Sequence, residues 1–292
     1  MTSKKNEVGV RLLTFKAYDQ ANQIGVLIGD SVFPLDLTAH SDMTAFLAAG
    51  HPALVEAEKI RRGEVKPEQS YRLNDVQLLA PVTRPGKIIA VGLNYRDHAI
   101  ETKQEIPTSP IIFAKFPSSI NGPDADVILP EDDPQVDYEA ELAVVIGRKA
   151  KRVSEAEALD YVAGYMPLND VSARRWQFAD KQWVRGKSCD TFCPTGPWLT
   201  TRDAVPDPHA LAIRMRVNGN VVQDSNTSQL IFRIPALLHY ISAAITLEPG
   251  DIIATGTPDG VGVFRKPPVF LKSGDVMEVE IEGLGVLRNR IS

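Results

Sequence analysis

The chain has 292 residues and a formal net charge of −5, from 32 Lys and Arg against 37 Asp and Glu. A chain of this length buries roughly three-quarters of the surface that it exposes when unfolded, so it needs no disulfide framework, and it has only two cysteines. The acidic balance argues against nucleic acid or an anionic membrane as the main partner, and we find neither a membrane-spanning run nor a secretory signal. We therefore expect a globular protein of the cytoplasm.

The first eighty residues predict a small unit of mixed α and β structure. Its expected elements are strands over residues 10–18, 23–29 and 31–37, a helix over 42–49 and a loop over 61–70. The turn-prone segment between Leu78 and Lys87 predicts a domain boundary. The chain would then divide into a small N-terminal domain, residues 1–79, and a larger domain, residues 80–292.

The larger domain alternates short strands with long loops. We expect strands over 87–92, 139–146, 251–255, 276–281 and 285–290, a hairpin around 217–222, a helix from the capping box at Ser154 and Glu157 to Tyr161, and an apolar helix over 234–245. Because the strands are not regularly interleaved with helices, the pattern favours an α+β, mostly β architecture over a doubly wound parallel sheet.

Three carboxylates alternate along the strand candidate that precedes Ile146. On a strand, Asp137, Glu139 and Glu141 share one face, roughly 7 Å apart at about 3.3 Å per residue. Such a face can be a solvated one, or it can converge on a hard divalent cation that offsets the mutual repulsion. The apolar residues that follow favour a buried strand, whose charges need a partner.

Asp170 is the next acidic candidate. It can be a helix cap before Val171, or a third oxygen ligand beside Glu139 and Glu141. Ligation by carboxylates alone points to Mg²⁺, Mn²⁺ or Ca²⁺ and away from zinc, which prefers His or Cys.

His98 and Glu101 form a second group of interest. On a helix they are neighbours at i, i+3, so the carboxylate can orient the imidazole and raise its basicity. A histidine paired with a carboxylate in this way can act as a general base toward water. Taken alone the pattern is weak, because most such pairs are surface pairs.

Together these residues resemble the fumarylacetoacetate hydrolase family. The stretches that carry the resemblance follow the order of the family and are residues 91–98 (VGLNYRDH), 110–115 (PIIFAK), 137–147 (DYEAELAVVIG), 169–174 (NDVSAR), 185–188 (RGKS) and 255–262 (TGTPDGVG). The resemblance covers residues ~80 to 292, and it is more specific for the family than for the substrate.

The resemblance implies a mixed β-sandwich roll, a homodimer and one Mg²⁺ or Mn²⁺ per site. Carried over residue by residue, it assigns metal ligation to Glu139, Glu141 and Asp170 and not to Asp137. It assigns water activation to His98 and Glu101, with Lys187 as a further catalytic residue, and contacts with substrate oxygens to Arg174, Gln177, Lys187 and Thr257. Arg175 and Trp176 depart from the family, in which an acidic residue often follows the matched arginine.

The function expected from these assignments is divalent-metal-dependent hydrolysis of a C–C bond in an acylpyruvate or diketo acid. The alternative on the same site is an oxaloacetate decarboxylase, or an isomerase or hydratase of 2-oxo acids, because one cation that stabilises an enolate serves all of these reactions. A third hypothesis is a non-enzymatic module that binds Ca²⁺ structurally. It leaves His98, Lys187 and Arg174 without a role.

Overall fold

One long mixed sheet runs through the protein. The computed structural model describes residues 9–18, 20–36 and 38–292, and within them this sheet has eleven strands in the order β4-β3-β2-β1-β14-β11-β10-β17-β6-β7, with β5 also paired to β1. The strands are β1 Arg11–Lys16, β2 Gln23–Ile28, β3 Ser31–Pro34, β4 Tyr71–Arg72, β5 Gln77–Leu79, β6 Ile88–Gly92, β7 Ile111–Lys115, β10 Ala140–Ile146, β11 Val162–Asn169, β14 Leu199–Thr201 and β17 Ile252–Ala254. The β17–β6 pair is parallel and the other pairs in this sheet are antiparallel.

A second, antiparallel sheet packs against the first. Its order is β16 (Asn220–Asn226), β15 (Ala212–Val217), β18 (Val276–Ile281) and β19 (Gly285–Arg290). Two short pairs complete the strands, namely β9 Val136–Asp137 with β12 Ser172–Ala173 and β8 Ile120–Asn121 with β13 Cys193–Pro194. The mostly β sandwich architecture with mixed sheets is therefore confirmed.

The helices are short and lie around the sheets. They are α1 Met43–Ala48, α2 His51–Arg61, α3 Arg96–Thr102, α4 Arg174–Ala179, α5 Val184–Lys187 and α6 Ile234–Ala244, with 3₁₀ turns at Leu73–Asp75, Pro117–Ser119, Ala158–Tyr161, Arg202–Ala204, Thr227–Gln229 and Gly262–Phe264. Within the described part of the chain, none of them combines the length and the apolar character that a membrane crossing requires.

Strand β10 lies at the centre of the core, which explains its nearly unbroken run of apolar residues. Val144 and Ile146 pack toward the second sheet and α6. Ala143 and Val145 face the opposite way, into a cluster that also holds Leu12 of the N-terminal hairpin. Both faces of β10 are buried, so a charged side chain at the start of this strand is largely shielded from bulk water.

Most of the expected elements are present. The hairpin of β1 and β2 forms as predicted, although its turn residue Asp19 and the end of the expected third strand, Leu37, lie outside the described residues. Asp42 caps α1 through the backbone N–H of Ala45, and α6 begins at Ile234. Asn218 and Gly219 both have positive φ, as the predicted Asn-Gly hairpin turn requires.

Two expectations about local structure were wrong, and one helix was not predicted. Helix α1 ends before Gly50 as expected, but α2 begins directly after this glycine, which has φ +69°. The capping-box bond between Ser154 and Glu157 forms at 2.7 Å, yet only a 3₁₀ turn follows, because the chain enters β11 at Val162. The carboxylate strand is also interrupted after Asp137, which belongs to the separate strand β9.

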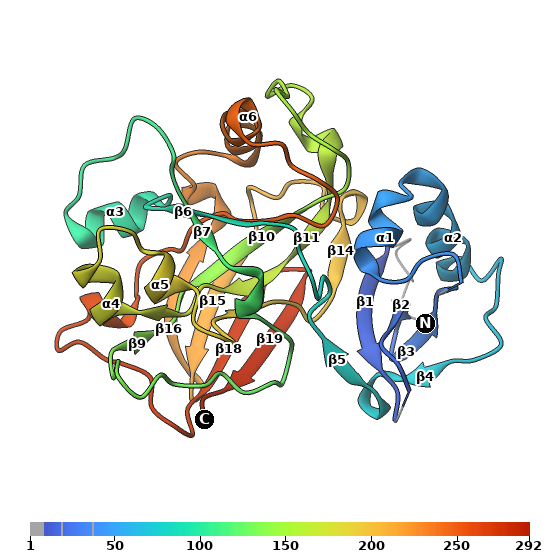
Figure 1. Cartoon of the computed structure of the whole chain (residues 1–292), viewed down its shortest axis with the longest axis horizontal. Helices are drawn as coiled ribbons and strands as arrows, with labels where there is room; N and C mark the ends of the chain where they lie inside the picture. The colour runs from blue at the N-terminus through green and yellow to red at the C-terminus, as the bar shows by residue number, and fades with distance from the viewer. Residues whose placement is uncertain (1–8, 19, 37) are drawn as a thin grey trace, which may run out of the picture.

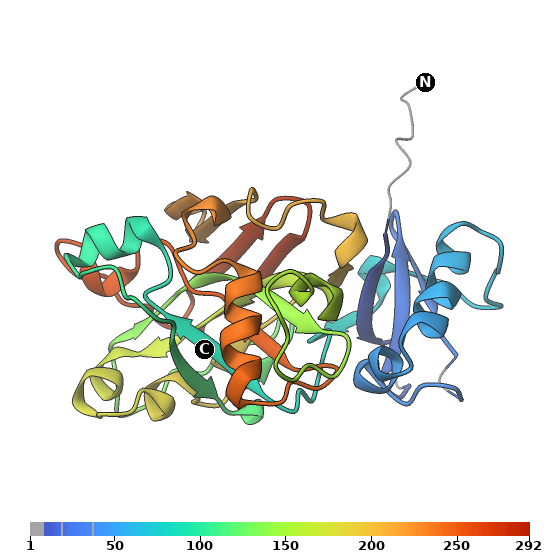
Figure 2. The same cartoon turned by 90° about the horizontal axis from the view of Figure 1, so that it is seen from above.

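The N-terminal strands and helices α1 and α2 lie at one end of the molecule in both views (Figures 1 and 2). Strand β1 pairs with β14 of the larger part, with Leu12 opposite Leu199. The hydrogen bonds of the main sheet therefore cross from one part to the other, and the division at residues 79 and 80 stays a prediction.

Candidate metal centre and active site

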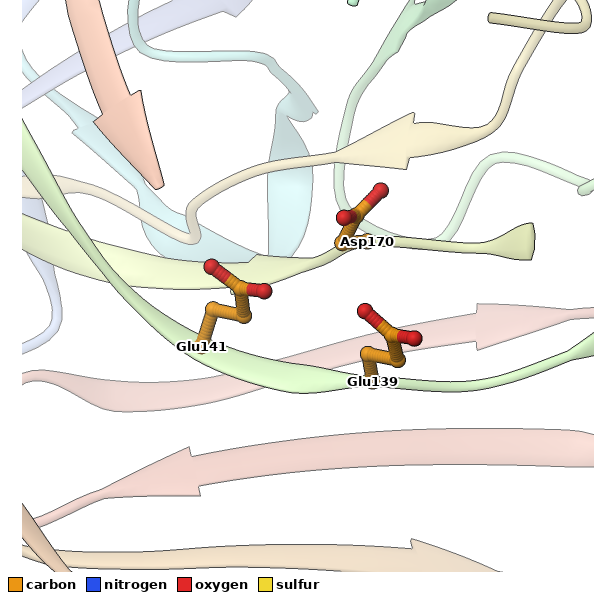
Figure 3. Close-up of side chains that lie close together, drawn as sticks. All are labelled: Glu139, Glu141 and Asp170. Carbon is orange, nitrogen blue, oxygen red and sulfur yellow. The ribbon is translucent and has the colours of Figure 1, made fainter. Parts of the chain in front are cut away.

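Three buried carboxylates converge where β10 begins and β11 ends. Glu139 and Glu141 are two residues apart and point to the same side, and Asp170 directly follows Asn169, which pairs with Ala140 (Figure 3). One oxygen from each carboxylate lies within 4.8 Å of the others. This arrangement can hold a metal ion.

Backbone hydrogen bonds fix the three carboxylates in place. The N–H of Glu139 donates to the side-chain Oδ1 of Asn169 at 3.0 Å, and the N–H of Asp170 donates to the carbonyl oxygen of Glu139 at 2.9 Å. The ends of β10 and β11 are thereby locked together, so the spacing of the carboxylates follows from the strand register.

Three buried cations surround this cluster. Lys187 Nζ lies 2.7 Å from both Glu139 and Asp170, Lys115 Nζ lies 2.6 Å from the other oxygen of Asp170, and Arg174 Nη1 lies 2.6 Å from Glu139. Burial alone would raise the pKa of Glu139, but the charges of Lys187 and Arg174 outweigh it and lower this pKa to about 2. Burial likewise opposes the charge of Lys187, and the two carboxylates beside it overcome burial and raise its pKa.

Glu141 differs from its neighbours because no cation of the cluster pairs with it. Its Oε2 accepts the backbone N–H of Gly256 at 2.7 Å. Burial, followed by the charges of Asp170 and Glu139, raises the pKa of Glu141 well above its usual value.

The charges of the cluster favour a divalent cation. With every group ionised, four buried carboxylates face three buried cations, which leaves the charge of Glu141 without a cationic partner; the groups are Asp137, Glu139, Glu141 and Asp170 against Lys115, Arg174 and Lys187. An uncompensated buried charge is costly. Carboxylate oxygens alone are the donor set of a hard cation, so these residues fit Mg²⁺, Mn²⁺ or Ca²⁺.

His98 and Glu101 meet on α3 as their spacing predicts. The ring Nδ1 of His98 lies 3.0 Å from Oε2 of Glu101. The other oxygen of Glu101 accepts the backbone N–H of Gly260 at 2.9 Å, which ties the pair to the loop after β17. The ring nitrogen Nε2 of His98 is then the one available to a ligand.

A cavity of about 220 Å³ lies between the histidine and the carboxylates. The structure brings seven of the predicted site residues into its lining, namely His98, Glu139, Glu141, Arg174, Gln177, Lys187 and Thr257. Glu101 and Asp170 lie behind the lining and contact it through His98 and Lys187. Aromatic side chains, among them Phe113 and Trp183, form an apolar wall.

Two further charged groups are buried beside the cluster, and one of them, Lys115, is not among the predicted site residues. Lys115 is buried on β7. The feature of the sequence that could have indicated it is a single lysine at the end of an otherwise apolar strand. Asp137 lies outside the group of three carboxylates that could hold a metal; its Oδ2 pairs with Arg174 Nη2 at 2.8 Å, and its Oδ1 accepts the N–H of Gly262.

The residues that depart from the family pattern are on α4 but do not line the cavity. Arg175 donates to the carbonyl oxygen of Asp132 at 3.2 Å, and the backbone N–H of Trp176 donates to Asp133 at 3.0 Å. The guanidinium of Arg185 stacks on the Trp176 ring at 5.0 Å. Neither Arg175 nor Trp176 is part of the cavity lining.

The sandwich of mixed sheets, with a buried carboxylate cluster beside a paired histidine and glutamate, is the architecture of a class of metal-site enzymes, and comparison with known proteins identifies the family. The model of the fumarylacetoacetate (FAA) hydrolase C-terminal region matches residues 87–292. The chain belongs to the fumarylacetoacetate hydrolase family.

Relatives cover nearly the whole chain. A mitochondrial oxaloacetate tautomerase of Xenopus laevis is 46% identical over 297 residues, which are 99% of this chain and 92% of that protein. The structure of fumarylacetoacetate hydrolase from the psychrophile Exiguobacterium antarcticum matches with a TM-score of 0.85 at 36% identity, over 97% of this chain and 99% of that one. A 2-hydroxyhepta-2,4-diene-1,7-dioate isomerase from Mycobacterium marinum matches with a TM-score of 0.79 at 37% identity, over 97% and 98%.

These relatives change the weight of the functional hypotheses. The chain is a family enzyme with a buried Glu, Glu and Asp site, and the names of its relatives favour the isomerase alternative over acylpyruvate hydrolysis. Because the Xenopus protein is named as mitochondrial, a cytoplasmic location for this chain stays a prediction. The homodimer and the choice between Mg²⁺ and Mn²⁺ also stay predictions.

Proposed function

We propose that this protein is a divalent-metal-dependent tautomerase of a 2-oxo dicarboxylic acid of the oxaloacetate class. The observation that carries the proposal is the placement of His98, held by Glu101, across one small cavity from Glu139 and Glu141. A tautomerase needs one base that moves a proton and a positive site that favours the enolate, and this cavity holds candidates for both.

Glu139, Glu141 and Asp170 would hold the cation. When bound, it supplies positive charge that stabilises negative charge on the 2-oxo oxygen of the substrate. Arg174 and Gln177 line the same cavity, and Arg174 Nη1 donates to Gln177 Oε1 at 2.9 Å, which leaves the amide N–H groups of Gln177 for a substrate oxygen.

In the proposed reaction, His98 moves one proton between two atoms of the substrate. With Nδ1–H donating to Glu101, the ring Nε2 has a free lone pair and takes the proton from the enol oxygen at C2. The electron pair of the C2=C3 double bond takes that same proton at C3 while the carbonyl forms at C2. Lys187 stays charged between Glu139 and Asp170, and it contributes a fixed positive charge beside the site.

The same pair supports a second candidate reaction. A histidine oriented by a carboxylate can deprotonate water, and water attack on an acylpyruvate would release pyruvate and a second acid. The position of His98 and Glu101 at the cavity is the specific observation that keeps hydrolysis as the second candidate.

The test measures both reactions on one preparation with Mg²⁺, with Mn²⁺ and with EDTA. We expect loss of enol-oxaloacetate absorbance faster than in buffer, dependence on the metal, and little release of pyruvate from acetylpyruvate. His98→Gln should lower kcat for tautomerisation about 10²- to 10⁴-fold, the usual contribution of a general base. Faster cleavage of acetylpyruvate than tautomerisation would replace the proposal by hydrolysis, and enol decay at the buffer rate would refute it.

A further inference from the structure

A buried glutamine links the second sheet to the loop that lines the cavity. Gln223 lies on β16 and is 2% exposed. Its side chain reaches the loop after β17, where Thr257 is part of the cavity lining. Nothing in the amino-acid pattern of β16 marks this residue as part of the site.

The polar atoms of Gln223 are all used, and their partners fix which way the amide is turned. Oε1 accepts the backbone N–H of Ala140 at 2.9 Å, and Nε2 donates to the carbonyl oxygen of Pro258 at 2.9 Å. The reverse orientation would place two donors together at Ala140 and two acceptors together at Pro258. The amide orientation therefore follows from backbone groups whose hydrogen-bonding roles cannot change.

This orientation determines the role of the threonine hydroxyl. The second N–H of Gln223 Nε2 donates to Thr257 Oγ1 at 2.8 Å, so the hydroxyl accepts at that point and must direct its own proton elsewhere. Among the described residues, the structure records no protein acceptor for that proton, and the side chain borders the cavity. The neighbouring Gly256 N–H donates to Glu141, which holds the same loop against the carboxylate cluster.

We propose that Gln223 is a positioning residue that turns the Thr257 hydroxyl into a hydrogen-bond donor toward an anionic oxygen of the bound 2-oxo acid. The inference rests on the proposed function, since it takes a carboxylate or enolate oxygen as the ligand group. A free hydroxyl can present a lone pair or a proton to the cavity, and only the proton attracts an anion. Gln223 removes that choice before the substrate arrives.

The experiment titrates oxalate, an anion with acceptor atoms only, into the full chain in the presence of Mn²⁺ and follows the heat of binding. Thr257→Val should weaken binding about 10- to 100-fold, as expected for a lost hydrogen bond to a charged group. Thr257→Ser should retain the wild-type affinity. Gln223→Glu should weaken binding at a pH where the new carboxylate is ionised, because that carboxylate accepts the hydroxyl proton and turns it away from the cavity.

Gln223→Met, which cannot donate and accepts only weakly through its sulfur, gives the variant for a double-mutant cycle. If Gln223 acts through the hydroxyl, its substitution weakens oxalate binding in the wild-type background and has no further effect in Thr257→Val. If Gln223 instead acts by holding Ala140 and the carboxylates, the two losses add, and the proposal is overturned. Gln69→Glu, at an exposed position, controls for the added charge and should leave binding unchanged.

The outcomes separate this inference from the proposed function. A wild-type chain that binds oxalate and converts enol-oxaloacetate, with additive effects in the cycle, refutes the role of Gln223 alone. A wild-type chain that binds no oxalate with Mn²⁺ refutes both. Unfolding curves of each variant establish that a loss of binding is not a loss of fold.

Discussion

At the scale of single residues, Glu141 is the most informative member of the carboxylate cluster. Glu139 and Asp170 each pair with Lys187, whereas Glu141 has the N–H of Gly256 and no cationic partner. Its burial beside two carboxylates raises its pKa, which means that its charge is unfavourable in the metal-free protein. A bound divalent cation would relieve that cost.

Glu141→Gln tests this reasoning. The amide keeps an acceptor for Gly256 N–H and removes the unpaired charge, so the free energy of unfolding without metal should stay equal or increase. In wild-type protein, Mn²⁺ at a hundred times its Kd should add about 2.7 kcal/mol to this free energy, and the variant should lose that gain. Chemical unfolding with and without Mn²⁺ measures both effects.

Asp251→Asn provides the matched control for Glu141→Gln. Asp251 is also a buried carboxylate, but it lies outside the group of three carboxylates, and Lys87 pairs with it at 2.7 Å. Its substitution should lower stability equally with and without Mn²⁺, because it leaves the lysine unpaired. Retention of the full Mn²⁺ response by Glu141→Gln would show that Glu141 is not a ligand.

Contacts within the site can be predicted from the sequence when the two residues in contact are close together in the chain. The contact of His98 with Glu101 and the shared face of Glu139 and Glu141 follow from the local geometry of a helix and a strand. The pairing of Arg174 with Asp137 joins residues 37 positions apart, and Gln223 reaches Ala140 across 83 positions. Such contacts arise from strand register and sheet packing, which no local pattern encodes.

At the scale of elements, the start of α6 depends on a residue outside the helix. The N-cap residue Arg233 makes no side-chain capping bond, and the backbone N–H of Ile234 donates to Nε2 of His209 at 3.2 Å. Burial lowers the pKa of His209 below its usual 6.5, against the opposing charge of Asp207. The neutral ring is therefore the form that supports the first turn of α6.

This arrangement predicts a loss of stability with acid. Because the pKa of His209 is lower in the folded protein than in the unfolded chain, the unfolded chain binds more protons as the pH falls through about 6.5. The contribution of His209 to the free energy of unfolding is fully present above that pH. It decreases as the pH falls further, by at most about 1.4 kcal/mol per pH unit. Unfolding at about pH 7.5 and about pH 5.5 should show a smaller decline for His209→Gln, which keeps an acceptor without the titration. An equal decline in both proteins would refute the assignment.

The sequence predicts best those elements that form through contacts between residues close together in the chain. Alternation and turn chemistry locate the β1–β2 hairpin and the β15–β16 hairpin, because each is a local structure. The capping bond between Ser154 and Glu157 does form, but no α-helix follows it, because the chain enters strand β11 at Val162. Helix α1 ends before Gly50 as predicted, whereas α2, which was not predicted, begins directly after the positive φ of that glycine.

At the scale of the whole molecule, β14 connects the N-terminal strands of the main sheet to the rest of that sheet. It pairs with β1 on one side and with β11 on the other, so it links the N-terminal strands to the strand that precedes Asp170. The contact with β11 is close at Gly164, where a Cβ atom would lie 2.1 Å from the carbonyl oxygen of Thr200. Glycine is required there for backbone approach and not for its dihedral freedom.

Gly164→Ala should therefore force β11 and β14 apart. Since the obstacle is backbone, we expect a loss of about 1–3 kcal/mol in the free energy of unfolding, the usual cost of overpacking. Urea unfolding measures this loss. Gly219→Asn, in a turn with open space and a φ that asparagine tolerates, should have little effect. Equal stability of the Gly164→Ala chain and the wild type would contradict the close contact.

The pairing of β1 with β14 also determines where the chain can be cut. A fragment that starts at residue 80 would lack Leu12 and its neighbours, and it would expose the free edge of β14 together with apolar side chains such as Met166 and Leu199 that share their cluster. An unpaired strand beside an apolar surface recruits strands from other copies. The β1–β2 hairpin therefore covers the edge of β14. We expect a fragment that starts at residue 80 to aggregate more readily than the full chain.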